Sequence, residues 1–347
     1  MHPLRLAGLC GFLAVGWSAT GSAQASSSDE PVRLTVSGVI YAEYAYALRS
    51  ADGAGHANNF DVTRAYLNFI GRFPEGVGSR ITGDVYRNAD GSLGYRLKYG
   101  FVTYQPKGSA LTFRLGQMDT PFVSYNEGLW DYRMQGSDPT DRAGYLKSSD
   151  FGAGIDGSWG DDKVTLSSGV FNGEFYNKTP GDQHKDVAAR LSVRLLESDQ
   201  AGRYGGLRLT GFALVGEPNG GGVRSRVLGG VTYRSKQVIL GGHFGVMRDR
   251  VDSTLTAPTT KGTLLSLMGV YRVPSSKVAF IGRYDNNDPD TGTPNDRIET
   301  IIAGVSYQLS PNLRLLADVD HVMYQAPISP AVDADRSQAL FQIQLAF

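Results

Sequence analysis

Cysteine, long hydrophobic runs and net charge are all nearly missing from this chain of 347 residues. The only cysteine is Cys10, which excludes a disulfide framework within the chain. No run reaches the roughly 18 apolar residues that a membrane-spanning helix needs. Because 34 basic residues balance 34 acidic ones, the chain also lacks the basic excess of a nucleic-acid-binding domain.

Glycine and two aromatic residue types are abundant instead. The chain contains 44 glycines, 18 tyrosines and 15 phenylalanines. Glycine destabilises the interior of helices, whereas tyrosine and phenylalanine suit the pleated surface of a sheet. The composition therefore disfavours a helical or doubly wound enzyme and favours an all-β protein.

The N-terminus has the three parts of a secretory signal peptide. Residues 1–5 carry one positive charge, residues 6–19 are apolar, and Ala23-Gln24-Ala25 forms a cleavage motif. We expect a signal peptide over residues 1–25, with cleavage after Ala25 or Ala23, and one mature domain over residues 26–347. An uncleaved membrane anchor is the alternative. The apolar run continues past Cys10, which argues against lipoprotein processing.

Apolar and polar residues alternate with a period of two from Val32 onward, as in half-buried strands. The last segment is the clearest, because its opposite face carries glutamines and its apolar face is formed by Ala339, Phe341, Ile343, Leu345 and Phe347. A strand that ends the chain in this way resembles the C-terminal signal read by the barrel-assembly machinery of bacterial outer membranes. The alternative is an amphipathic strand of a β-sandwich.

Sixteen segments follow this alternation: 32–48, 60–73, 79–87, 94–106, 110–118, 151–159, 163–172, 185–195, 205–216, 225–234, 237–247, 262–273, 277–285, 298–309, 313–323 and 336–347. Connections after even-numbered segments are mostly short and those after odd-numbered ones longer, as in outer-membrane barrels. The connection 197–205 is longer than the other connections that follow even-numbered segments. In hydrocarbon every backbone amide needs a partner, so such a sheet must close. We predict a 16-stranded antiparallel transmembrane β-barrel with both termini in the periplasm.

The connection 119–150 is far longer than any other. A loop of this length in a compact protein is usually functional. It contains more acidic than basic residues: Asp119, Glu127, Asp131, Asp138, Asp141 and Asp150 against Arg133, Arg142 and Lys147. Packing of this loop on a neighbouring subunit is the alternative to a role in the channel.

Several short motifs around this loop resemble those of porins. They are Leu115–Pro121, Glu127–Arg133 and Ser148–Gly154, together with Phe60–Leu67 near the start of the chain. The chain most resembles the sixteen-stranded porins related to the phosphate-selective porins O and P. This resemblance implies a homotrimeric outer-membrane channel for small solutes, in which the third external loop folds inward and narrows the pore. The dense loop lysines of the phosphate-specific members are missing.

The strand register sorts the charges by face. Arginine facing lipid at mid-depth costs about 2–4 kcal/mol, so we place the strand arginines in the lumen, where bases outnumber acids. We expect Arg64, Arg96, Lys98 and Arg114 to form a basic patch opposite the acidic loop. The predicted constriction comprises these four residues with Asp119, Glu127, Asp131, Arg133, Arg142 and Lys147. The alternative is that the arginines pair with wall acids and brace the barrel.

The sequence predicts no enzyme, cofactor or metal site. Asp320 and His321 are neighbours and point to opposite faces of a strand, and the segment 285–292 lacks EF-hand spacing. We therefore predict a porin for passive diffusion of small hydrophilic solutes and ions, with mild anion preference. A channel specific for phosphate or another anion and an adhesin-type barrel remain alternatives. The expected partners are outer-membrane lipid, lipopolysaccharide and the assembly machinery, and no nucleic acid.

Overall fold

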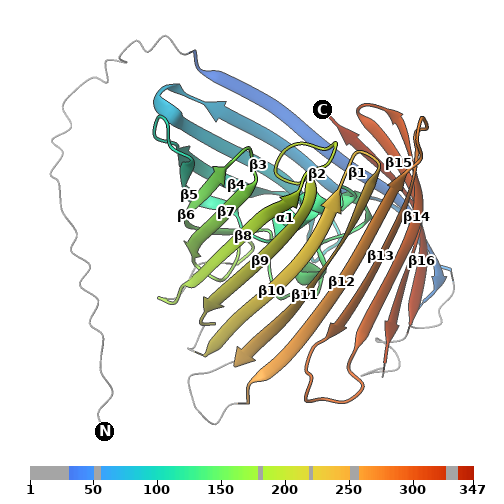
Figure 1. The fold of residues 1–347 in the computed structure, drawn as a ribbon. Helices are drawn as coiled ribbons and strands as arrows, with labels where there is room; N and C mark the ends of the chain where they lie inside the picture. Colours follow the sequence, from blue (N-terminus) through green and yellow to red (C-terminus); the bar gives the residue numbers. More distant parts are fainter. Residues whose placement is uncertain (1–30, 51–55, 179–182, 219–221, 251–257, 326–334) are drawn as a thin grey trace, which may run out of the picture.

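The computed structural model describes residues 31–50, 56–178, 183–218, 222–250, 258–325 and 335–347. These residues form one closed β-barrel with a long connection inside it. Each strand pairs antiparallel with its sequence neighbours, and β1 pairs with β16 to close the sheet (Figure 1). The strands are β1 (Arg33–Arg49), β2 (Asn58–Arg72), β3 (Val77–Arg87), β4 (Leu93–Tyr104), β5 (Leu111–Asp119), β6 (Ser149–Trp159), β7 (Val164–Phe171), β8 (Asp186–Leu196), β9 (Gly206–Gly216), β10 (Val223–Arg234), β11 (Val238–Arg250), β12 (Thr260–Arg272), β13 (Val278–Asp288), β14 (Ile298–Ser310), β15 (Leu313–Tyr324) and β16 (Arg336–Ala346). The predicted all-β fold class is confirmed, and no predicted strand end is wrong by more than three residues.

Strand β8 shows how the sequence sets the two faces of the wall. Arg190 and Ser192 are almost fully buried on the lumen side, whereas Val187 and Leu191 on the outer side are 52% and 48% exposed. Large apolar side chains are exposed in the same way on the other strands. An outer face of this kind is stable against hydrocarbon, and the polar inner face is stable against water or a polar loop.

The ends of the chain close the barrel. The backbone N–H of Gly38 in β1 donates to the carbonyl oxygen of Phe347 at 2.8 Å, and the N–H of Phe347 donates to Gly38 at 3.0 Å. The Phe347 ring covers Gly38 so closely that a Cβ atom there would lie 2.4 Å from it. A larger residue at this position would require the Phe347 ring and the nearby Tyr66 carbonyl group to shift. On the expected signal face, Phe341, Leu345 and Phe347 are exposed and Ile343 is partly buried.

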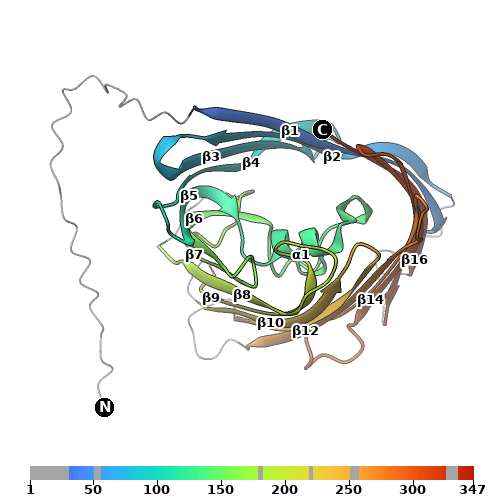
Figure 2. The same ribbon diagram turned by 45° about the horizontal axis from the view of Figure 1, so that its top comes forward.

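The wall is uneven in height. β1 and β2 have 17 and 15 residues, but β5 and β7 have only 9 and 8. The connection that enters the lumen begins at the end of β5, one of the two shortest strands, and lies within the ring of strands (Figure 2). Among the described residues, no helix is long and apolar enough to cross a membrane.

Candidate pore constriction

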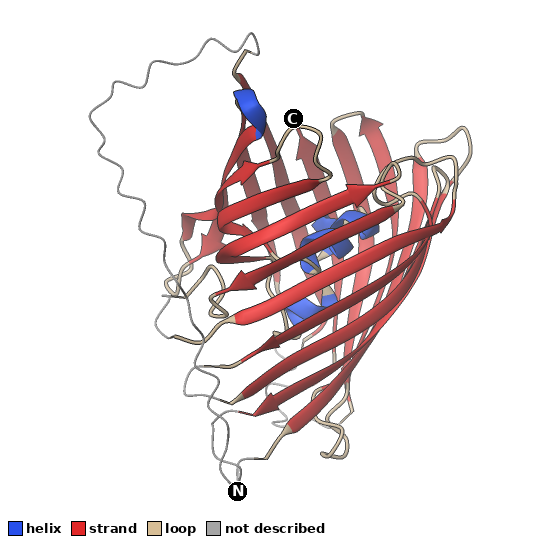
Figure 3. Ribbon diagram, turned by 60° about the vertical axis from the view of Figure 1, so that its left-hand side comes forward, coloured by secondary structure: helices blue, strands red, loops and turns tan. Residues whose placement is uncertain are grey.

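The connection between β5 and β6 lies inside the barrel and contains three short helices. These are α1 (Val123–Trp130), the 3-10 helix η2 (Arg133–Gln135) and α2 (Pro139–Arg142), seen within the ring of strands in Figures 2 and 3. α1 ends at Asp131, whose left-handed conformation (φ 63°) turns the chain. α2 begins at Pro139, and the Asp138 carboxylate caps it by accepting from the Thr140 N–H at 2.8 Å.

Apolar side chains anchor both ends of this loop to the wall. Phe122, Val123 and Leu146 pack with wall residues such as Phe171 and Phe212 in one cluster. Trp130, Tyr132 and Met134 pack in a second cluster with wall residues from β1, β11, β12, β13 and β15. The loop therefore has its own core against the barrel and holds a fixed position.

Arginines of the wall fix the loop backbone. Five of them donate to loop carbonyl oxygens, and Gln342 of β16 adds a sixth such bond: Arg190 to Pro121 at 2.9 Å, Arg234 to Gly128 at 2.7 Å, Arg314 to Asp131 at 2.7 Å, Arg283 to Ser137 at 3.1 Å, Arg226 to Tyr145 at 3.2 Å and Gln342 to Met134 at 2.9 Å. Much of the positive charge predicted to face the lumen therefore holds the loop in place.

Asp131 lies at the centre of this attachment. Its carboxylate is 2.7 Å from a guanidinium nitrogen of Arg272, 3.6 Å from Arg314 and 3.8 Å from Arg234. Its side chain is 32% exposed. Three wall cations thus share one negative charge, and we call these four residues the Asp131 clasp.

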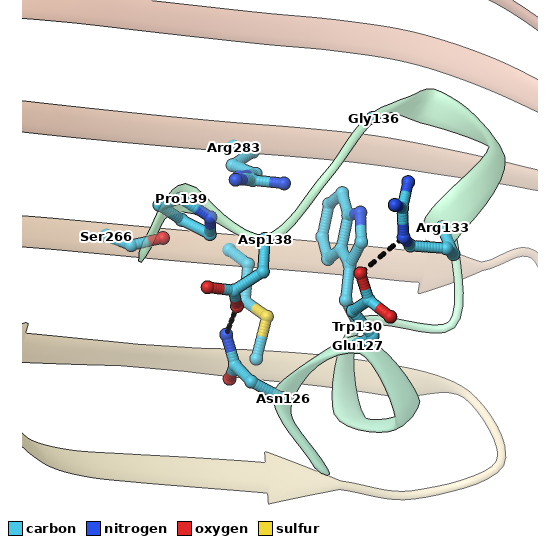
Figure 4. Close-up of a pocket in the computed structure, with 10 residues that line it drawn as sticks. Asn126, Glu127, Trp130, Arg133, Gly136, Asp138, Pro139, Ser266 and Arg283 are labelled. Atoms are coloured by element: carbon cyan, nitrogen blue, oxygen red, sulfur yellow. Dashed lines mark hydrogen bonds and ion pairs between the residues drawn. The ribbon is translucent and has the colours of Figure 1, made fainter. Parts of the chain in front are cut away.

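The other charged loop residues also have partners. Asp119 pairs with Arg114 at 2.7 Å, and Lys147 pairs with Asp141 at 2.7 Å. Glu127 pairs with Arg133 beside Trp130, and the Asp138 carboxylate accepts from Asn126 (Figure 4). Arg142 pairs with Asp285 of β13. The acidic charge predicted from the loop sequence is therefore largely neutralised within the site.

The facing wall, β2 to β4, carries cations that lie against tyrosine rings. Arg80 lies 4.4 Å from the Tyr99 ring centroid, and Arg96 lies between Tyr86 at 4.8 Å and Tyr176 at 4.7 Å. The Lys98 ammonium is 3.9 Å from the Tyr176 ring and contacts Ser148. Tyr176 comes from the connection after β7, and burial raises its pKa, which keeps the phenol neutral. Neutral rings of this kind orient cations without cancelling their charge.

The structure brings some of the predicted constriction residues together. Arg64 bonds to Tyr66 and pairs with Asp84 at 3.0 Å, and both Arg64 and Lys98 lie within electrostatic range of Glu127. Three others lie elsewhere: Arg114 pairs with Asp119 and with Asp156 at 2.9 Å, Asp131 faces β10, β12 and β15, and Arg142 faces β13.

Two loop groups have pKa values changed by burial. Burial raises the pKa of the Tyr145 phenol to about 12, and it lowers the pKa of the Arg142 guanidinium, with the nearby Arg283 adding to that effect. In the described part of the chain, no three His, Cys, Asp or Glu side chains are arranged to hold a metal ion.

A closed sixteen-stranded barrel with a loop folded into its lumen defines the porin class of channel. The sequence profile of the Gram-negative porin family matches residues 12–326. The chain therefore belongs to the Gram-negative porin family, and it is an outer-membrane channel and not an enzyme. Comparison with curated protein sequences gave no significant match.

Solved porin structures share this fold at low sequence identity. OmpT of Vibrio cholerae is 10% identical with a TM-score of 0.65, covering 92% of this chain and 99% of its own. The channel DcaP of Acinetobacter baumannii is 13% identical, with 92% and 99% coverage and a TM-score of 0.66. OmpF of Salmonella typhi is 14% identical, with 90% and 97% coverage and a TM-score of 0.66. At these identities the likeness concerns the fold alone.

Proposed function

We propose that this porin is a general diffusion pore for small hydrophilic solutes and ions with a mild preference for anions. The observation that carries the proposal is an imbalance in pairing across the constriction. Glu127 and Asp131 on the loop each have a cationic partner. On the facing wall, no described carboxylate lies within ion-pairing distance of Arg80, Arg96 or Lys98, whose contacts are tyrosines, hydroxyls and an amide.

An imbalance of this size gives modest selectivity. Unpaired charges in a narrow water-filled lumen raise the local concentration of counter-ions and steer them inward. Salt weakens the effect, because the screening length is about 10 Å at 0.1 M ionic strength. Arg80 and Arg96, the partly exposed cations of this wall, therefore favour anions without excluding cations.

The test is the zero-current potential of the purified protein in a planar bilayer that separates two potassium chloride concentrations. The proposal predicts a potential whose sign corresponds to a chloride permeability above that of potassium. Cation selectivity in low salt would contradict it. Current that rises linearly with voltage, and conductance that rises with salt without saturating, would support a general pore.

A channel specific for an anion is the second candidate. It is favoured by the fixed geometry at Arg96, whose guanidinium lies between two tyrosine rings. A preorganised site of this kind binds a carboxylate or phosphate at low cost in ordering. A closer relation to the phosphate-selective porins rests on the short motifs in the sequence. Conductance that saturates at low phosphate concentration would select this candidate.

We also propose a homotrimer, exported with cleavage of residues 1–25, which lie outside the described residues. OmpT of Vibrio cholerae has been solved in a trimer form. The face of Phe341, Ile343, Leu345 and Phe347 would serve as the assembly signal, and lipopolysaccharide would surround the barrel. Migration of unheated protein as a trimer that dissociates on heating, and sequencing of the mature N-terminus, test these points.

A further inference from the structure

We propose that the long periplasmic turn 197–205 braces the constriction loop from below and thereby positions Glu127 in the pore. The turn joins β8 to β9 and stands out among the periplasmic turns by its length; the turn between β14 and β15 spans only residues 311–312. This inference rests on the proposed constriction between Glu127 and the β2–β4 wall.

The turn has a fixed shape. The Ser198 hydroxyl donates to the carbonyl oxygen of Arg234 at 2.6 Å and accepts from the Gly206 N–H at 3.0 Å. Arg208, fully buried, donates to the carbonyl oxygens of Gly202 and Gly205 at 3.1 Å each. The turn is thus tied to β9 and β10, and its conformation is set by bonds that are independent of the constriction loop.

Tyr204 carries the contact from this turn to the loop. A Cβ atom built on Gly128 of α1 would lie 2.3 Å from the Tyr204 hydroxyl oxygen, so the phenol lies directly against the backbone there. The Tyr204 ring centroid is 5.4 Å from that of Tyr125, one turn earlier in α1. Arg234 lies 5.8 Å from the Tyr204 centroid and donates to the Gly128 carbonyl oxygen at 2.7 Å. α1 is therefore held between the turn and the wall.

The position of α1 determines the position of the charge in the pore. Glu127 precedes Gly128 directly, and Glu127 is the loop acid in electrostatic range of Arg64 and Lys98. A shift of Gly128 away from Tyr204 moves Glu127 with it. The Coulomb energy between the Glu127 carboxylate and a permeating ion depends on their separation. At an effective dielectric constant near 20, a change of about 1 Å at a separation of about 6 Å alters ion permeability roughly twofold. Tyr204 is thus a positioning residue for ion selectivity.

A double-mutant cycle tests the contact. Gly128→Ala places a methyl group about 1 Å closer to the phenol than atoms normally approach, so either the helix or the Tyr204 side chain must shift. We expect Gly128→Ala to change the permeability ratio roughly twofold and the Gly128→Ala/Tyr204→Ala pair to reverse that change, since coupled residues are non-additive. Gly211→Ala, whose added methyl group meets no atom within 4 Å, is the matched control with an unchanged ratio.

Each outcome decides the proposal. If the two changes simply add, or if Gly128→Ala has no effect, the brace is refuted. If Gly128→Ala does not fold, Tyr204→Ala must change the ratio while Tyr204→Phe retains it, and equal behaviour of these two variants refutes the brace. A silent Glu127→Gln would show that the position of Glu127 does not affect permeating ions and would contradict the brace, whereas a cation-selective wild-type channel contradicts the proposed function. A changed ratio in Glu127→Gln without coupling between Gly128 and Tyr204 contradicts the brace alone.

Discussion

Asp131 connects the constriction loop to three arginines of the wall, and Asp131→Asn removes its charge while keeping its shape. In the wild-type protein one carboxylate lies 2.7 Å from Arg272, 3.6 Å from Arg314 and 3.8 Å from Arg234. An amide can still accept one hydrogen bond, but it leaves the three guanidinium groups without a counter-charge. Two effects follow, one on loop mobility and one on ion selectivity.

The magnitude follows from the geometry of the clasp. A hydrogen bond to a charged group contributes about 1.5–3 kcal/mol, and the partial exposure of Asp131 places the loss near 2 kcal/mol. Because every 1.4 kcal/mol is about tenfold, the loop is released from the wall about 30-fold more often. The bond from Arg314 to the Asp131 backbone carbonyl, at 2.7 Å, persists in the variant. The barrel therefore folds normally, and the released loop stays a minor state.

Single-channel recording detects both effects. We expect Asp131→Asn to show more open-channel noise or brief substates, together with a higher chloride-to-potassium permeability ratio. Asp161→Asn is the matched control, because Asp161 lies exposed on the short turn between β6 and β7, outside the connection 119–150. A variant with wild-type noise and a wild-type permeability ratio would refute the role of the clasp.

Two further predictions concern closure and screening. Gly38→Val places its side chain against the Phe347 ring, where even a Cβ atom would lie 2.4 Å away, and we expect a loss of about 1–3 kcal/mol, seen as a lower urea midpoint for the refolded barrel. Unchanged stability would show that the Phe347 ring can move aside at no cost. Anion preference should fall as salt rises towards about 1 M, where the screening length is about 3 Å. A permeability ratio independent of salt would mean that the preference has another origin than wall charge.

The strands were predictable because lipid and water act on alternate residues along the whole chain. Val187 and Leu191 must face outward and Arg190 inward, so one pattern sets strand position, register and closure together. The same pattern showed the length of the connection 119–150, because the alternation of apolar and polar residues stops there. Its inward path was an expectation from resemblance, and the structure agrees with it.

The partner of each charged side chain in the lumen was not predictable, because it depends on contacts between residues far apart in sequence. Asp131 and Arg314 are separated by 183 residues, and Met134 and Gln342 by 208. Alternation places an arginine in the lumen but does not say whether it meets a loop carbonyl or a solute. Nothing in the sequence pointed to Tyr176. For Tyr204 the only signal was the unusual length of the turn 197–205 in which it lies.

The unpaired cations of the β2–β4 wall are tested most directly by removing them together. The measurement is the zero-current potential in a potassium chloride gradient for the wild-type channel and for the Arg80→Gln/Arg96→Gln/Lys98→Gln variant, each checked for folding. Because the loop acids remain paired, we predict anion preference in the wild type and its loss in the variant. An unchanged potential after removal of these three charges would contradict the assignment of selectivity to this wall.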